Sequence, residues 1–268
     1  MRPDMRMPEL PDVEAFRRLL ADHATGQRIE RVTAPAPDVL RNTTPQALGR
    51  ALHNRRFSEP TRHGKWLFAA TDDGDGPIVV LHFAMSGFLA WAPVGAPRDD
   101  HDRVIFGCTD GELRFNQMRK LGGVWLARDS SERGGITGPL GPDALDIGRD
   151  AFHKVLDRRK GMIKSALMDQ QVLAGLGNLT VDEVLWHARV HPRTRLDALE
   201  AGARDRLHEA LRGVLAESVE HGRVPARDGW LTGSRDDEQS TCPRCGTRVE
   251  QGTVASRTTY WCPRCQQL

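Results

Sequence analysis

The chain has 268 residues, of which 39% are hydrophobic and 28% are charged, and its formal net charge is +2. This length allows two domains and the apolar content supports real cores, so a wholly disordered chain is excluded. A charge so close to zero does not by itself indicate a nucleic-acid-binding protein. No apolar stretch approaches the roughly 20 residues of a membrane span and no secretory signal is visible, so we expect a cytoplasmic protein with no membrane contact.

The first half of the chain changes from a helical to a strand pattern. Apolar residues at helical spacing predict a helix over 13–23, and Gly26 is placed to end it. From about residue 28 onward, short apolar runs alternate with turn signals such as Asp110-Gly111, which favours an antiparallel sandwich or barrel. The predicted strands are 29–32, 66–70, 78–83, 103–106, 113–115 and 124–126.

The second half is predicted to be helical and to end in a small cysteine module. A stretch rich in Gly, Ser and Pro, 130–148, is interpreted as a linker. Helices are predicted over 149–159, 162–171, 180–186 and 196–221, and the polar segment 223–240 is predicted to be a loop. The resulting domains are 7–135, 148–232 and 238–268.

Four of the five cysteines form two Cys-x-x-Cys pairs, Cys242 with Cys245 and Cys262 with Cys265, sixteen residues apart. Each pair presents two thiolates from one tight turn, so the two pairs close a tetrahedral shell around one zinc ion. Four thiolates leave no open position for water, so the ion is expected to be structural. Cys108 stands apart in a predicted strand and is interpreted as a buried small apolar residue.

A glycine-rich turn precedes one of the predicted helices. Gly175 and Gly177 permit a tight turn with exposed backbone N–H groups, and a helix is expected directly after them. The N-terminus of a helix attracts anions. The turn is therefore a candidate phosphate site.

Several motifs resemble, in the same order, those of the formamidopyrimidine-DNA glycosylase / endonuclease VIII family. They are Met7-Pro8-Glu9-Leu10-Pro11, His63-Gly64-Lys65-Trp66-Leu67, His82-Phe83-Ala84-Met85-Ser86-Gly87, the stretch from Leu113 to Gly122, the stretch from Lys164 to Pro192, and Arg257 to Gln266. The resemblance implies an α+β fold, in which an antiparallel β-sandwich with an N-terminal helix precedes a helix-two-turn-helix domain and a four-cysteine zinc-finger hairpin. The implied protein is a monomeric repair enzyme acting on double-stranded DNA with oxidised or abasic lesions.

The resemblance also implies a catalytic set. Pro8, exposed by removal of Met7, would attack the sugar C1′ as a secondary amine, and Glu9 would be the general acid/base that opens the sugar ring. Lys65 and Arg257 would assist the β- and δ-eliminations that nick the strand. As printed, however, the chain begins at Met1, and with residues 1–7 retained Pro8 is an amide. Translation from Met7 is one explanation; a damaged-DNA-binding protein without lyase activity is the alternative.

A second implied set contacts DNA. Met85, Arg119 and Leu121 would fill the space left by an extruded base, while Lys164 and Asn178 would hold the flanking phosphates. The chain departs from the family in places. Gln117-Met118 replaces Asp-Pro, Leu121 replaces phenylalanine, and Thr180-Val181 replaces Tyr-Ala. Leu121 leaves the opposite-base preference open. The preferred lesion stays open because the stretch 223–241 is shorter than the loop that caps oxidised guanine in the formamidopyrimidine branch of the family that the chain resembles.

Overall fold

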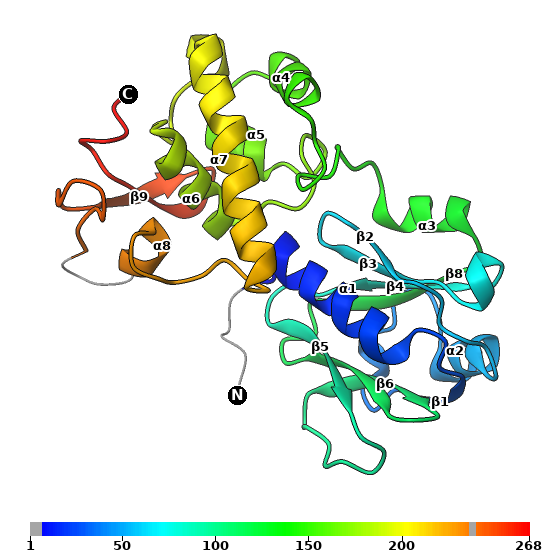
Figure 1. The fold of residues 1–268 in the computed structure, drawn as a ribbon. Helices are drawn as coiled ribbons and strands as arrows, with labels where there is room; N and C mark the ends of the chain where they lie inside the picture. The colour runs from blue at the N-terminus through cyan, green and yellow to red at the C-terminus, as the bar shows by residue number, and fades with distance from the viewer. Residues whose placement is uncertain (1–6, 236–239) are drawn as a thin grey trace. The chain divides into compact units, whose positions relative to one another are not determined.

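A computed structural model describes residues 7–235 and 240–268 (Figure 1). The extension at 1–6, on which the prediction for Pro8 depends, and part of the predicted loop 223–240 lie outside these residues. The chain forms two compact units. Residues 12–139 make up most of the first, and residues 140–268 together with Glu9–Pro11 make up the second.

Two four-stranded antiparallel sheets form the first unit. One has the order β1-β6-β7-β5, with β1 at Ile29–Thr33, β6 at Asp102–Cys108, β7 at Glu112–Gln117 and β5 at Gly87–Ala92. The other has the order β2-β3-β4-β8, with β2 at Thr61–His63, β3 at Trp66–Ala69, β4 at Ile78–His82 and β8 at Gly123–Ala127. Every strand pair in both sheets is antiparallel.

Apolar side chains from both sheets share one core. Phe106 and Phe115 from one sheet and Leu67 and Leu81 from the other are all 1% exposed or less and belong to the same cluster. Helix α1 (Leu10–Ala24) adds Val13, Leu20 and Ala24 to this cluster. The predicted sandwich and its N-terminal helix are therefore confirmed.

The first unit also contains elements that the sequence did not predict. These are β2, β5, helix α2 (Pro45–Leu52) and the short 3-10 helices at Pro37–Val39 and Asp72–Gly74. In addition, the predicted linker 130–148 contains helix α3 (Ser130–Thr137). Asp129 caps α3 by accepting from the Glu132 N–H at 2.8 Å, and the Glu132 carboxylate accepts from the N–H of Arg128, the residue before the cap, in a variant of the capping box. This capping stabilises a helix despite two internal glycines.

The second unit is helical, as predicted, with two differences: a short helix lies in the predicted loop 223–240, and the predicted helix 196–221 is divided into a 3-10 turn and a longer α-helix. It contains α4 (Arg149–Asp157), α5 (Ile163–Met168), α6 (Asn178–Ala188), a 3-10 turn (Leu196–Ala198), α7 (Ala201–Glu220) and α8 (Leu231–Ser234). Helix α6 is buried along nearly its whole length, since it packs against α5, α7, α8 and the hairpin strand β10. Its apolar residues, including Val184 and Leu185, join one core with Phe152 of α4 and Leu211 of α7.

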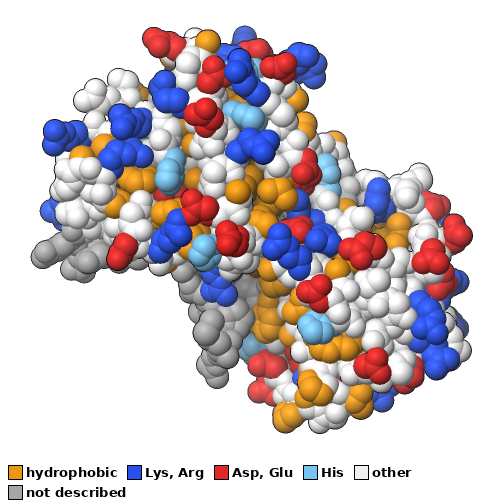
Figure 2. Space-filling model, in the orientation of Figure 1, with side chains coloured by type: hydrophobic (Ala, Val, Ile, Leu, Met, Phe, Trp, Pro, Cys, Tyr) orange, Lys and Arg blue, Asp and Glu red, His pale blue; other side chains and the backbone are white. Residues whose placement is uncertain are grey.

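The cysteine module is a β-hairpin of β9 (Glu250–Val254) and β10 (Arg257–Trp261). Its two turn residues, Ala255 and Ser256, both have φ near +55° (53° and 57°), the geometry of a type I′ turn. In the described ranges, no helix has the length and apolar character that crossing a membrane requires. Figure 2 shows basic and acidic side chains interspersed on the visible face, in keeping with the net charge of +2.

Candidate functional site

The carboxylate of Glu9 lies at the N-terminus of α6. Its Oε2 accepts from the N–H groups of Gly177 and Thr180, both at 3.0 Å, and its Oε1 accepts from the Leu179 N–H at 2.9 Å. The Thr180 hydroxyl donates to the same Oε2 through a short hydrogen bond. Gly177 is the N-cap of α6 and has no side chain, so Glu9 supplies the cap from a distant part of the chain.

This arrangement corrects the phosphate site predicted at the glycine turn. The N–H groups expected to face solvent are bonded to Glu9, which is itself 3% exposed, and the Gly175 N–H donates to the Gln170 side chain. The anion that α6 attracts is thus a carboxylate of the same chain. The glycines remain necessary, because a Cβ at Gly177 would lie 2.3 Å from the Glu9 carboxyl carbon, and Gly175 has a φ of +114°.

Lys164 also has a different environment from the predicted one. Its side chain is fully buried, and Nζ donates to Asp182 Oδ1 at 2.6 Å and to the Thr259 hydroxyl at 2.7 Å. A direct phosphate contact is therefore not available to Lys164 in this structure. Burial lowers the pKa of Lys164 and raises the pKa of Asp182 to about 6, so the aspartate is ionised at neutral pH and the two form a buried ion pair.

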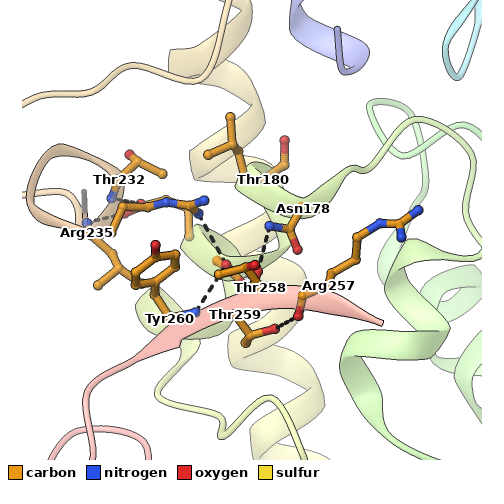
Figure 3. Close-up of polar contacts among 12 residues, drawn as sticks. Asn178, Thr180, Thr232, Arg235, Arg257, Thr258, Thr259 and Tyr260 are labelled. Atoms are coloured by element: carbon orange, nitrogen blue, oxygen red, sulfur yellow. Dashed lines mark hydrogen bonds and ion pairs between the residues drawn. The ribbon is translucent and has the colours of Figure 1, made fainter. Parts of the chain in front are cut away.

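Asp182 is the centre of a polar network that the sequence did not reveal. Figure 3 shows its members Arg235, Thr259 and Tyr260. Its Oδ2 lies 3.2 Å from Arg235 Nη1 and 3.4 Å from the Tyr260 N–H, and the Arg235 guanidinium lies over the Tyr260 ring. The Thr259 hydroxyl donates in turn to the Arg257 carbonyl at 2.9 Å. The network therefore fixes the zinc hairpin to α5 and α6 through charged groups.

Arg257 and Asn178 are the first residues of β10 and α6, respectively. Arg257 is exposed and, in Figure 3, its side chain extends away from Arg235 and Tyr260. Asn178 is half-buried, and its Nδ2 donates to the Thr258 carbonyl at 2.9 Å. Its Oδ1 has no hydrogen-bond partner among the residues that the structure describes. The structure thus places Asn178, at the start of α6, against the hairpin residue that follows Arg257.

The four cysteines of the zinc module converge. Their sulfur atoms all lie within 4.8 Å of one another, as four ligands of one ion require. Backbone and side-chain donors support the sulfurs, since the Cys265 N–H lies 3.4 Å from Cys262 Sγ and the Trp186 Nε1–H lies 3.3 Å from Cys242 Sγ. The donor set fits zinc, and the predicted structural ion is confirmed.

Cys108 is 4% exposed in β6, and burial raises the pKa of its thiol to about 12. It is therefore an unreactive core residue, as predicted.

In the first unit, Met85, Arg119 and Leu121 come together from two neighbouring loops. Arg119 Nη1 lies 3.9 Å from Met85 Sδ, and Leu121 is 56% exposed. Gln117 joins the loops by donating from Nε2 to the Phe83 carbonyl at 2.7 Å. The three predicted DNA-contacting side chains thus form one surface, called here the wedge surface.

Lys65 lies at the turn between β2 and β3 of the same unit and is half-buried. Burial, reinforced by the charge of Lys65, lowers the pKa of His82 to about 4. His82 is therefore neutral at physiological pH.

Pro8 is buried and immediately precedes Glu9, while Met7 is 41% exposed. In the sequence as printed, Pro8 is joined to Met7 by an amide bond, so its nitrogen has no free lone pair for nucleophilic attack. Nucleophilic chemistry at Pro8 therefore requires cleavage between Met7 and Pro8.

Three family models match the chain in succession. They are the formamidopyrimidine-DNA glycosylase N-terminal domain over residues 7–124, the formamidopyrimidine-DNA glycosylase H2TH domain over 140–228, and the zinc finger found in FPG and IleRS over 239–268. Together they cover most of the chain and occur in the order that the motifs predicted.

Curated relatives and solved structures agree with these models. The formamidopyrimidine-DNA glycosylase of Symbiobacterium thermophilum is 37% identical over 98% of this chain and 90% of its own, and that of Herpetosiphon aurantiacus is 34% identical over 97% and 100%. A solved complex of the Lactococcus lactis Fpg with DNA containing an abasic site has a TM-score of 0.86 at 29% identity, covering 97% of this chain and all of that one. The chain belongs to the formamidopyrimidine-DNA glycosylase family.

Proposed function

We propose that this protein is a bifunctional DNA glycosylase and apurinic-site lyase that removes oxidised bases from double-stranded DNA. The observation that carries the proposal is the succession of family matches over most of the chain, with Pro8-Glu9 at the beginning of the first match. The solved relative bound to abasic-site DNA supports the assignment of DNA as the substrate. The bacterial relatives support a cytoplasmic place of action, and we expect the enzyme to act as a monomer.

The proposed reaction begins when the nitrogen of Pro8, freed as a chain terminus, attacks C1′ of the damaged nucleotide and the base leaves. Glu9 protonates the sugar ring oxygen as the ring opens, which leaves an iminium between Pro8 and the sugar. Lys65 and Arg257 assist the two eliminations that follow, at the phosphates on either side. The Asn178 Nδ2 donates one N–H to the Thr258 carbonyl, next to Arg257, and we assign its second N–H to a flanking phosphate.

Reductive trapping of the iminium tests this proposal. Two preparations are compared: a chain expressed from Met7, with its terminus sequenced to verify that Pro8 is exposed, and the full chain with residues 1–7 retained. Borohydride is expected to link the first covalently to duplex DNA with an abasic site or an oxidised base, and to leave the second unlinked. A chain that begins at Pro8 and yields no adduct on any of these duplexes would contradict the proposal. Duplex binding without an adduct would then support the non-catalytic alternative.

The wedge surface makes a separate prediction about duplex substrates. Replacing Leu121 by alanine removes an exposed apolar group that would fill the space of the extruded base, and an exposed side chain contributes little to folding. We expect the single-turnover excision rate on duplex DNA to fall about tenfold, with the melting temperature unchanged. Val94→Ala is the matched control, because Val94 is also exposed, at 67%, but lies outside the wedge surface. Equal rates for the two variants would exclude this role for Leu121.

A further inference from the structure

Thr180 occupies a position at which the chain departs from its family, where the pattern has tyrosine. Its side chain is fully buried in the first turn of α6. The hydroxyl is bonded to Oε2 of Glu9, the same oxygen that accepts from the Gly177 and Thr180 N–H groups. Thr180 thus places a group that can both donate and accept in contact with the residue to which we assign proton transfer.

The other three groups named at the Glu9 carboxylate, the N–H groups of Gly177, Leu179 and Thr180, can only donate. They satisfy an ionised carboxylate well. A general acid, however, must also exist with a proton on one oxygen, and that proton needs an acceptor, which an N–H group cannot supply. Of these four contacts, only the Thr180 hydroxyl can reverse its direction.

We propose that Thr180 is a positioning residue for Glu9, and that its hydroxyl reverses direction when Glu9 changes protonation state. With Glu9 ionised, the hydroxyl donates to Oε2. With Glu9 protonated, Oε2–H donates to Oγ1, and the threonine hydrogen rotates to the Gly177 carbonyl one turn earlier, as helical threonines can do. Glu9 then keeps its place at the end of α6 in both states. This inference rests on the proposed function, because it assumes that Glu9 transfers a proton.

Thr180→Val tests the inference, because valine has nearly the same shape and lacks only the hydroxyl. Thr180→Ser restores the hydroxyl on a smaller side chain, and Glu9→Gln removes the acid. All chains begin at Pro8. Single-turnover excision from a duplex with an oxidised base is measured at saturating enzyme, together with the dissociation constant for a duplex carrying a stable abasic-site analogue. Thermal unfolding shows that each variant is folded.

We expect Thr180→Val to lower the excision rate about 10- to 100-fold and to change the dissociation constant less than about threefold. Thr180→Ser should recover at least about a third of the wild-type rate. An active wild type with an inactive Glu9→Gln variant but a fully active Thr180→Val variant would overturn this inference and leave the proposed function intact. A Thr180→Ser variant as slow as Thr180→Val would also overturn it, since packing would then be the cause. A wild type that excises nothing would overturn the proposed function, and this inference with it.

Discussion

Asp182→Asn is expected to lower the free energy of unfolding of the second unit by about 3–5 kcal/mol, because it leaves Lys164 charged and buried without a counter-ion. Arg235, only 9% exposed, loses the same partner. The measurement is urea unfolding followed by tryptophan fluorescence at pH 7.5. Burial raises the pKa of Asp182 from 3.8 to about 6, so its contribution to stability falls as the pH rises from about 4 to about 6 and is constant above that range. At pH 7.5 the contribution of Asp182 to stability therefore no longer changes with pH.

Two further variants separate the ion pair from general damage to the fold. Lys164→Met combined with Asp182→Asn removes both charges of the pair and should recover the stability that was lost through the unpaired Lys164, because methionine fills the buried space of the lysine stem. Arg235 lacks Asp182 in both variants, so the comparison isolates the contribution of Lys164. Asp197→Asn breaks an exposed pair with Arg195, in which both side chains are at least 60% exposed, and should leave the unfolding midpoint unchanged. If the double variant is as unstable as Asp182→Asn alone, the buried pair is not the cause.

Removal of zinc is expected to unfold the cysteine module while the β-sandwich stays folded. The apolar cluster at the module is small and includes two of the ligands themselves, Cys242 and Cys262, so the metal must supply most of its stability. Structural zinc in small fingers contributes about 10–16 kcal/mol, far more than this cluster can replace. Hydrogen exchange after chelation should show loss of protection in β9 and β10 and unchanged protection in β6 and β7.

Single substitutions provide the matched comparison for the zinc prediction. Cys245→Ser should reduce bound zinc from one ion per chain to none and give the same exchange pattern as chelation. Cys108→Ser changes the remaining cysteine, which lies in β6, and should retain one zinc ion. Protection of β9 and β10 that survives complete loss of zinc would show that the hairpin is stable without the ion.

Loss of the buried Lys164–Asp182 ion pair and loss of the zinc ion should affect Arg257 in the same way. Arg257 begins β10, its carbonyl accepts from Thr259, and Thr259 is bonded to Lys164. The buried ion pair and the zinc ion therefore hold the same strand from two sides. We expect both kinds of variant to lose the second elimination before they lose duplex binding, since the wedge surface belongs to the other unit.

The sequence predicted those parts of the fold that depend on local periodicity. Helices over 149–159 and 180–186 and strands over 78–83 and 124–126 appear close to their predicted bounds. Helix α2 was missed although Thr44-Pro45 is a recognisable start signal, and Thr44 does cap it. Helix α3 was missed because Gly134 and Gly135 lower helix propensity, while its packing depends on Arg133 over Phe68, far away in the chain.

The candidate site also has one part that the sequence predicted and one part that it did not. The spacing of Cys242, Cys245, Cys262 and Cys265 by itself determined a zinc site, because two short turns carry all four ligands. Only the tertiary structure decided that Glu9 caps α6, across 168 to 171 residues of sequence, and that Lys164 is paired with Asp182 and Thr259. A motif shows which charged groups a chain possesses. Which of these charged groups become buried depends on partners that are distant in sequence. A charged group is buried only where the fold supplies a counter-charge or hydrogen-bond donors for it.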